Sequence, residues 1–326
     1  MNMPDSNSSR PLRTPVLFMV FNRLDTTKRV FEAIRRAKPP RLYVAADGPR
    51  ADRPGEGEKV QAVRDYVMNS IDWDCEIKTL FRDHNLGCKY AVTGAINWFF
   101  ENEEMGIILE DDCLPDQSFF MFCQELLGRY RDDKRIMMIS GDNFQFGKER
   151  TENSYYFSRY THIWGWASWR RAWNLYDCGM STWPEIYGNR FLKDILSDKR
   201  AAKYWESIFN SVYHGSIDTW DYQWVFSCWI QGGLSIIPNR NLVSNIGFGQ
   251  SSTHTRDKSP FSNLSTERIE FPLKHPTFVI RNVSADNFTE KIWYSQSRSR
   301  KILLGLKEIK LMFKSKSVWR GHGKSL

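Results

Sequence analysis

Four short apolar runs alternate with longer, more polar segments in the first third of the chain. Each run is too short for a helix and is bounded by proline, glycine or polar residues, as expected for strands buried in a sheet. The runs lie at 16–21, 41–46, 75–81 and 107–109. The segments between them, of about a dozen residues, have helical character. Strands that alternate with helices predict βαβ units around a mostly parallel sheet.

The rest of the chain predicts a more mixed arrangement. The expected elements are a helix at 118–130, strands at 135–140, 155–158 and 233–237, and a largely helical region reaching Ile230. Trp166, Trp169 and Trp173 fall at the spacing of one helix face, so we expect a tryptophan-rich helix packed on the core. The whole pattern predicts the α/β class, with a central sheet flanked by helices.

The formal net charge of +8 is concentrated at the C-terminus. Residues 291–326 contain ten lysines and arginines and one acid, Glu308, so they carry +9 and leave −1 for residues 1–290. Apolar residues recur there at helical spacing, with lysines between them: Ile302, Leu306, Ile309 and Phe313. A basic amphipathic helix is typical of binding to an anionic membrane surface, and docking on the protein's own domain is the alternative.

The sequence has neither a secretion signal nor a run of about 18 apolar residues, and residues 1–14 are polar, which predicts disorder. The six cysteines form no CxxC pair or zinc-type cluster, so we expect reduced thiols. The nearly neutral body has no basic groove or nucleic-acid motif, so no nucleic-acid partner is expected. We therefore expect a cytoplasmic protein, peripheral on the cytoplasmic membrane face through its tail.

Three consecutive carboxylates, Glu110, Asp111 and Asp112, follow the fourth apolar run. Adjacent like charges repel, so a positive partner is expected beside them. Carboxylate oxygens are hard ligands suited to Mn²⁺ or Mg²⁺, particularly when nucleotide phosphates complete the coordination shell. The alternative is an acidic turn that caps a helix beginning near Pro115.

Polar residues also follow the first two predicted strands, Asn22 and Arg23 after one and Asp47 after the other. Ligands of parallel sheets bind beyond the carboxyl ends of the strands, so we expect these residues and the acidic triplet to line one edge. Two plain alternatives remain open. Asp47 can belong to an ordinary β-turn, and Arg23 can form a surface salt bridge.

The segment GIILEDDCLPDQSFFMFCQELL resembles the acidic motif of nucleotide-sugar-dependent glycosyltransferases of the GT-A fold, and its EDD form is most similar to the N-acetylglucosaminyltransferase I type. Other segments resemble that family in the same order: VLFMVFNR, VAADG, IMMISGDN, HIWGW and TWDYQW. The resemblance is remote and spans roughly residues 15–255. It implies a GT-A domain with a nucleotide-sugar-binding half at 15–117 and an acceptor-binding half at 118–290, followed by the tail at 291–326.

The resemblance implies a separate role for each acid of the triplet. Asp112 would bind a Mn²⁺ or Mg²⁺ ion that bridges the donor diphosphate. Asp111 would contact the ribose or the donor sugar, and Glu110 would orient the set. Asp47 would contact the base, with Arg23 near the nucleotide or its phosphates.

Two further segments are expected to contact the donor. The family has a nucleotide-contacting histidine upstream of its acidic motif, where this chain has Ala95. Lys89, in an earlier turn of the same predicted helix, is the candidate to replace that contact. The segment GFGQSSTHT, which contains His254, resembles a family loop that closes over the diphosphate. A plain flexible connector is the alternative for this loop.

An acceptor hydroxyl needs a base within hydrogen-bond reach. The resemblance points to SIDTWDYQW, where Asp221 is the candidate base and Asp218 the reserve. The alternative is a capping arrangement, with Asp218 as N-cap and Asp221 three residues later. His162 and Trp164 are candidates for contact with the acceptor sugar, and a buried aromatic pair is the alternative.

The sequence thus predicts a metal-dependent glycosyltransferase. It would move a hexose or N-acetylhexosamine from a nucleoside-diphosphate sugar, especially a UDP-sugar, to a glycan or lipid-linked glycan, with inversion. One rival is a sugar-phosphate nucleotidyltransferase, which usually has a glycine-rich phosphate loop with a lysine after the first strand; FNRLDTT lacks one. The other rival is a non-catalytic carbohydrate-binding protein that uses some of the 13 tryptophans.

Overall fold

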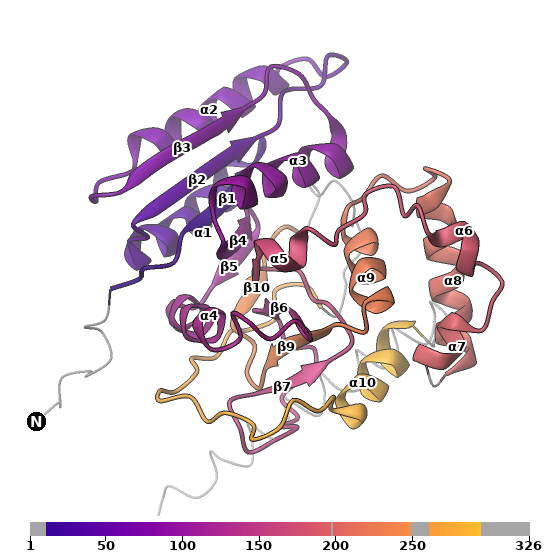
Figure 1. Cartoon of the computed structure of the whole chain (residues 1–326). Helices are drawn as coiled ribbons and strands as arrows, with labels where there is room; N and C mark the ends of the chain where they lie inside the picture. Colours follow the sequence, from indigo (N-terminus) through magenta and orange to yellow (C-terminus); the bar gives the residue numbers. More distant parts are fainter. Residues whose placement is uncertain (1–10, 197, 249–260, 295–326) are drawn as a thin grey trace, which may run out of the picture.

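The computed structural model describes residues 11–196, 198–248 and 261–294. Within these ranges the chain forms one eight-stranded mixed sheet with helices on both faces (Figure 1). In spatial order the strands are β3 (Glu76–Phe81), β2 (Arg41–Ala46), β1 (Val16–Val20), β4 (Met105–Glu110), β8 (Trp166–Trp169), β6 (Ile136–Ser140), β9 (Leu234–Pro238) and β7 (Tyr155–Ser158). The predicted α/β class, with a mostly parallel first half and a mixed second half of the sheet, is confirmed.

The first half of the sheet is parallel because β1 to β4 are joined by helices that return the chain to the same edge. Every residue of β1 is buried, and its side chains alternate between two apolar clusters, with Phe18 in one and Leu17 in the other. Residues of α1 (Leu24–Ala37), α2 (Glu56–Asn69) and α4 (Gln117–Arg129) form the first cluster. Residues of α3 (Gly87–Asn102), α5 (Arg170–Trp173) and α9 (Asp221–Ile230) form the second.

The second half of the sheet is mixed, as predicted. Strand β8 runs antiparallel to both β4 and β6, β9 is parallel to β6, and β7 is antiparallel to β9. A separate antiparallel pair, β5 (Cys113–Pro115) with β10 (Val243–Asn245), begins immediately after the acidic triplet. This pair brings the residues after β10 back to the carboxyl end of the parallel strands.

The predicted tryptophan-rich helix is wrong, although the prediction that its three tryptophans pack in the interior is confirmed. Trp166 and Trp169 lie in β8, and only Trp173 is helical. Residues three apart on a strand point to opposite faces, so Trp166 joins the cluster around α3 and Trp169 joins the cluster around α4. A central strand buried on both faces accommodates large apolar residues on either side, which the helical spacing concealed.

A helical lobe packs beside the sheet (Figure 1). Its elements are α6 (Trp183–Ile186), α7 (Phe191–Ile195) and α8 (Lys199–Tyr213), which share a third apolar cluster with α9. The C-terminal described elements are α10 (Val283–Thr289) and a π-helix, η1 (Glu290–Tyr294). Among the described helices, none combines the length and apolarity needed to cross a bilayer. Most of the predicted amphipathic tail, residues 295–326, lies outside the described residues.

Candidate active site

The loops that follow β1 and β4 meet at the carboxyl end of the sheet. Because the two strands are parallel neighbours, with Met19 paired to Glu110, each delivers its next residues to the same edge. The Arg23 guanidinium contacts the carboxylates of both Asp111 and Asp112, and its Nη2 lies 3.0 Å from Asp112 Oδ2. Burial opposes the charged guanidinium, but the two carboxylates outweigh it and raise the pKa of Arg23. The chain itself therefore places a positive partner beside the triplet.

Asp111 is the most buried acid of the triplet, with 3% of its surface exposed. Its Oδ1 pairs with Arg23, and its Oδ2 accepts the backbone N–H of Phe21 at 3.3 Å. Burial raises the pKa of Asp111 to about 6, although the Arg23 charge acts in the opposite direction. Both oxygens thus hold the ends of β1 and β4 together, and the contact with ribose or donor sugar stays a prediction.

Asp112 is more accessible, with 15% of its side chain exposed. The residues after β10 cover it closely: Ile246 donates its backbone N–H to the Asp112 carbonyl at 2.8 Å. A Cβ added to Gly247 would clash with Asp112 Oδ2 and lie 2.7 Å from Arg23 Nη1. Glycine at this position therefore lets the backbone lie directly against the Arg23–Asp112 pair.

The carboxylates at this edge are too few to hold a metal ion without further ligands from the substrate. In the described part of the chain, no three His, Cys, Asp or Glu side chains are grouped so as to hold a metal ion by themselves. Each of the two aspartates accepts from two protein donors, Asp111 from Arg23 and Phe21 and Asp112 from Arg23 and, at 3.5 Å, the Cys113 thiol. The Asp112 side chain is the more exposed, at 15% against 4%. Mg²⁺-type ions are commonly held by one or two carboxylates together with substrate phosphates and water. Asp112 would suit a site of that type only with substrate phosphates and water as the remaining ligands, and its role as a metal ligand stays a prediction.

Glu110 and Asp221 lie within electrostatic reach of each other, although they come from β4 and α9. Burial, then the charges of Asp112 and Asp111, and more weakly that of Asp221, raise the pKa of Glu110 to about 8. Asp221 is the first residue of α9 and accepts a hydrogen bond from the Thr219 hydroxyl. The structure thus brings the candidate base to the edge that holds the acidic triplet.

The capping alternative for Asp218 and Asp221 is wrong, because α9 begins at Asp221 and Trp220 occupies its N-cap. Asp218 instead caps a distant helix: its two carboxylate oxygens accept the backbone N–H groups of Cys88 and Lys89, each at 3.1 Å, in the first turn of α3. Gly87, the residue before Cys88, makes room for this contact, because a Cβ there would lie 2.9 Å from Asp218 Oδ2. Gly87 also has φ +77°, a conformation that favours glycine.

Cys88 is a site residue that the sequence reasoning missed. Burial raises the pKa of its thiol, and four carboxylates add to the effect: Glu110, Asp221, Asp218 and Asp47. The thiol is therefore neutral and lies within electrostatic reach of these four acids. Its position a few residues beyond the apolar run at 75–81, at the start of the next helix, was the signal that could have found it.

Asp47 follows β2 and organises the loop before α3. Its carboxylate accepts the side-chain amide of Asn85 at 2.9 Å and the backbone N–H of Leu86 at 3.1 Å. Burial raises the pKa of Asp47, although these bonds oppose the shift. The ammonium of Lys89 lies 5.5 Å above the ring of Tyr90. The roles of Asp47 and Lys89 in nucleotide binding stay predictions.

His162 is buried and Trp164 is partly buried, so both belong largely to the interior of the protein. His162 is 6% exposed, its ring packs edge-on against Phe144 at 4.6 Å, and burial lowers its pKa to about 3. Trp164 donates its backbone N–H to Asp142 at 2.9 Å, and its partly buried ring packs against the core. This placement favours the alternative of a buried aromatic pair. His254 lies outside the described residues.

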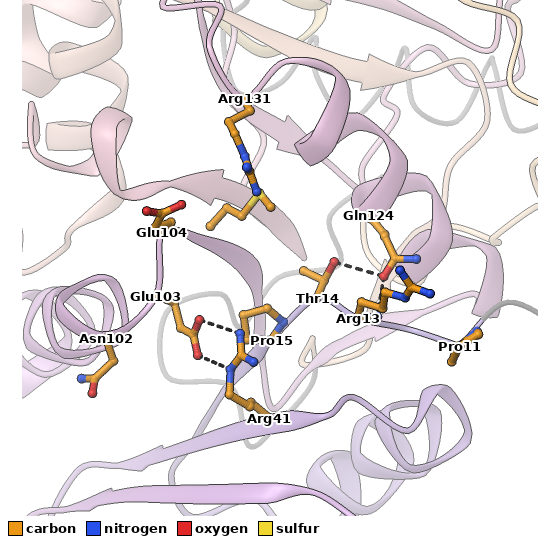
Figure 2. Close-up of a pocket in the computed structure, with 11 residues that line it drawn as sticks. Pro11, Arg13, Thr14, Pro15, Arg41, Asn102, Glu103, Glu104, Gln124 and Arg131 are labelled. Carbon is orange, nitrogen blue, oxygen red and sulfur yellow. Dashed lines mark hydrogen bonds and ion pairs between the residues drawn. The ribbon is translucent and has the colours of Figure 1, made fainter.

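The opposite edge of the sheet has a separate cavity of about 700 Å³ at the amino ends of β1, β2 and β4 (Figure 2). Glu103 forms a bidentate pair with Arg41 there, at 2.5 and 2.9 Å, and accepts the Tyr43 hydroxyl at 2.9 Å. Arg13 and Thr14 bond to Gln124 on the other side. None of the residues predicted to bind the nucleotide sugar lines this cavity.

No family model and no curated protein matches the chain. Similar solved structures include the mannosyltransferase PcManGT from Pyrobaculum calidifontis in complex with GDP-Man and Mn²⁺, with a TM-score of 0.36, 11% identity, and 68% of this chain and 71% of that chain covered. HddC from Yersinia pseudotuberculosis has a TM-score of 0.30, 9% identity and coverages of 48% and 77%. The glycosyltransferase GlyE of Streptococcus pneumoniae TIGR4 has a TM-score of 0.29, 11% identity and coverages of 68% and 45%. Likeness at this level carries no inference about activity.

Proposed function

We propose that this protein is a metal-dependent glycosyltransferase that moves a hexose or N-acetylhexosamine from a nucleoside-diphosphate sugar, most readily a UDP-sugar, to a hydroxyl of a glycan or glycolipid. One observation carries the proposal. The Arg23–Asp112 pair lies against the Gly247 backbone at the carboxyl end of the sheet, and Asp221 is close to the same acidic edge. A cation, an accessible carboxylate and a second carboxylate are the groups that donor binding and acceptor activation need.

The donor diphosphate would bind at the Arg23–Asp112 pair. Asp112 would hold a Mn²⁺ or Mg²⁺ ion, which when bound supplies positive charge to the departing diphosphate. Arg23 adds a permanent guanidinium beside the same phosphates, since its pKa is raised further by Asp111 and Asp112. Asp47, at the end of β2, would contact the base from its partly buried position.

The acceptor hydroxyl would lose its proton to Asp221. The hydrogen bond from the Thr219 hydroxyl orients the Asp221 carboxylate at the start of α9. A base on the acceptor side, separate from the diphosphate on the donor side, matches direct displacement with inversion at the anomeric carbon. Asp218 is less suited to this role because both its oxygens cap α3.

The charge of the C-terminal segment supports an acceptor at a membrane. Residues 291–326 carry +9 within a chain of net charge +8, and clustered basic residues bind anionic lipid headgroups. We infer a peripheral position on the cytoplasmic face, where a lipid-linked glycan would be the acceptor. Sedimentation with anionic vesicles, but not with neutral ones, is the expected result, and deletion of residues 295–326 should abolish it.

The decisive test is a panel of nucleotide sugars with and without Mn²⁺, scored by release of the nucleotide. We expect release from one donor that depends on the metal and is lost in Asp112→Asn. Glu104→Gln, an acid at the opposite edge of the sheet, is the matched control and should keep full activity. No metal-dependent turnover or binding with any donor would refute the proposal. Release of pyrophosphate from a nucleoside triphosphate and a sugar phosphate would indicate a nucleotidyltransferase instead.

A further inference from the structure

Large apolar side chains are exposed on the segment that leads into α10. Phe278 and Ile280 are each 70% exposed, more than any other large apolar residue in the part of the chain that the structure describes. Val283, the first residue of α10, is 48% exposed. Single exposed apolar residues are common on proteins, but a group of large ones indicates a contact surface. We call Phe278, Ile280 and Val283 the apolar patch.

The backbone that carries the apolar patch is fixed to the edge of the sheet. Strand β7 is the last strand of the sheet, and Asn282 donates its backbone N–H to the Phe157 carbonyl in that strand at 2.8 Å. Val279 packs against the first apolar cluster. Neighbouring side chains of an extended segment point to opposite sides, so the inward Val279 leaves Phe278 and Ile280 facing outward together.

Positive side chains lie beside the apolar patch. The loop after β6 reaches the start of α10, where the Arg150 carbonyl accepts the side-chain amide of Asn282 at 3.1 Å. From this loop, the Lys148 ammonium and the Arg150 guanidinium lie 4.2 and 4.7 Å from the centre of the Phe288 ring in α10. Lys291, three residues beyond Phe288, is exposed.

The acids of α10 and η1 lie in the interior instead. Asp286 and Glu290 are almost completely buried. Arg159 pairs with both, and Arg281 pairs with Asp286 at 3.5 Å, so two guanidiniums balance the two carboxylates. In the adjoining loop, Glu149 is paired with an arginine after β9. The charge that α10 and η1 present to solvent is therefore positive.

We propose that the apolar patch inserts into the headgroup region of an anionic bilayer, with Lys148, Arg150 and Lys291 beside the lipid phosphates. This contact rests on the peripheral position included in the proposed function, and it adds the folded domain to the contact made by residues 291–326. Exposed apolar side chains flanked by cations suit a membrane interface, because the acyl boundary accepts the former and anionic headgroups attract the latter.

Charge distinguishes the bilayer from two other occupants of the apolar patch. Residues 291–326 have apolar side chains that could cover it, but they carry +9, and docking would bring like charges together. A second copy of the chain that paired through the same patch would place the cations of both copies at one interface. An anionic lipid surface offers the opposite charge to both the patch and the tail.

Two contacts from one chain would attach the protein more firmly than either alone. One weak membrane contact gives reversible binding, and stable attachment takes two. Lys291, the first basic residue of the tail, follows Val283 by eight residues, so the tail begins close to the apolar patch in the chain. Because the patch belongs to the folded domain, its insertion would also fix the orientation of that domain on the membrane.

Sedimentation of the full chain with vesicles measures the contribution of the apolar patch. The vesicles contain phosphatidylcholine, alone or mixed with phosphatidylserine. For the double variant Phe278→Ala, Ile280→Ala we expect the partition coefficient on mixed vesicles to fall about 10-fold or more, because apolar area no longer enters the interface. Ile77→Ala on β3, at the opposite edge of the sheet, is the matched control and should keep the wild-type partition. Equal partition of the double variant and the wild type overturns the proposal, as does a wild-type protein that does not bind the mixed vesicles.

Photo-crosslinking identifies what the apolar patch contacts. para-Benzoylphenylalanine replaces Phe278 in the full chain, the protein is irradiated with the mixed vesicles, and adducts are identified by mass spectrometry. An adduct with phospholipid supports the proposal. A covalent dimer, or a crosslink to a peptide from residues 291–326, without a lipid adduct overturns it.

Metal-dependent release of nucleotide without vesicles is scored separately, so the two proposals fail in different ways. Release that persists while the patch makes no lipid contact refutes the membrane contact alone. Lipid contact without release from any donor refutes the proposed transferase activity instead.

Discussion

At the proposed donor side, Arg23, Asp111 and Asp112 follow two neighbouring parallel strands, so the register of β1 and β4 brings them together. At the proposed acceptor side, Asp221 begins α9, which is held to α8 by a shared apolar cluster and belongs to no strand ladder. Backbone hydrogen bonds position the first group, and side-chain packing positions the second.

The difference predicts different responses to mutation. The strand ladder keeps the neighbours of the more exposed Asp112 in place, so a conservative change there should affect donor binding with little change in stability. Loss of the buried Asp111, whose carboxylate joins the ends of β1 and β4, should by contrast destabilise the protein. A packed aromatic ring or a distant cap contributes to stability as well, so acceptor-side substitutions should affect both.

The largest expected effect is that of Asp112→Asn. The variant keeps the shape of the side chain but removes the charge that would bind a divalent ion, so we expect Mn²⁺-dependent donor affinity to fall at least about 100-fold. Isothermal titration calorimetry with UDP-sugars, with and without Mn²⁺, measures the loss. Stability near that of the wild type is expected in the same samples, and equal donor affinity in the variant would remove Asp112 from the site.

Asp221→Asn should act on turnover and spare the donor. An amide cannot accept the proton of the acceptor hydroxyl, so we expect kcat to fall about 100-fold or more, by the usual size of acid–base effects. Donor affinity should stay within a factor of about two. A variant with wild-type kcat would contradict the assignment of Asp221 as base.

The buried His162 should make the protein less stable in acid. Its pKa is about 3 in the folded state, against about 6.5 when exposed, so the unfolded state binds the additional proton and stability falls as the pH drops below about 6.5. The loss from this group between pH 7.5 and pH 5 is about 2 kcal/mol. Urea unfolding at both values should show this decrease in the wild type and a smaller one in His162→Gln. The same decrease in both proteins would contradict the prediction.

Gly247→Ala tests the close approach of the backbone to the Arg23–Asp112 pair. The added Cβ would clash with Asp112 Oδ2, so the pair or the residues after β10 must shift. We expect the KM for the donor to rise about 10-fold, since small displacements of positioning groups are costly. Gly128→Ala in α4 is the matched control, because its Cβ meets nothing within 4 Å and should stabilise the helix by about 0.5–1 kcal/mol. A wild-type donor KM in Gly247→Ala would show that the approach is not needed.

The smallest expected effect is that of Asp218→Ala. It removes both hydrogen bonds at the start of α3, and loss of a helix cap costs about 1 kcal/mol. Asp218→Asn keeps one acceptor oxygen and should lose less. Chemical denaturation of the two variants and the wild type should show this order, and equal stability of all three would contradict the role as a cap.

The parallel half of the fold was predictable because its strands are continuous apolar runs and its helices are of ordinary length, so the information is local. The β8 strand was not, because Trp166, Trp169 and Trp173 imitate one helix face across a junction where a strand becomes a short helix. A local pattern cannot show that a segment pairs with β4 and β6 on either side.

The candidate site divides in the same way. Arg23 and the acidic triplet were predictable because they follow apolar runs, and the structure confirms that these loops meet at one edge. The cap that Asp218 places on α3 joins residues that are distant in the sequence, and no local signal indicates it.

Asp218 has one further consequence. Asp218 lies three residues before Asp221, and its carboxylate caps the N-terminus of α3. This helix follows the loop organised by Asp47. A designer who exchanged α8, α9 and the segment before α9 for those of another protein would remove this cap unless the replacement carried an acid at the same place. The start of α3 would then need a new cap, at a cost of about 1 kcal/mol if none were supplied.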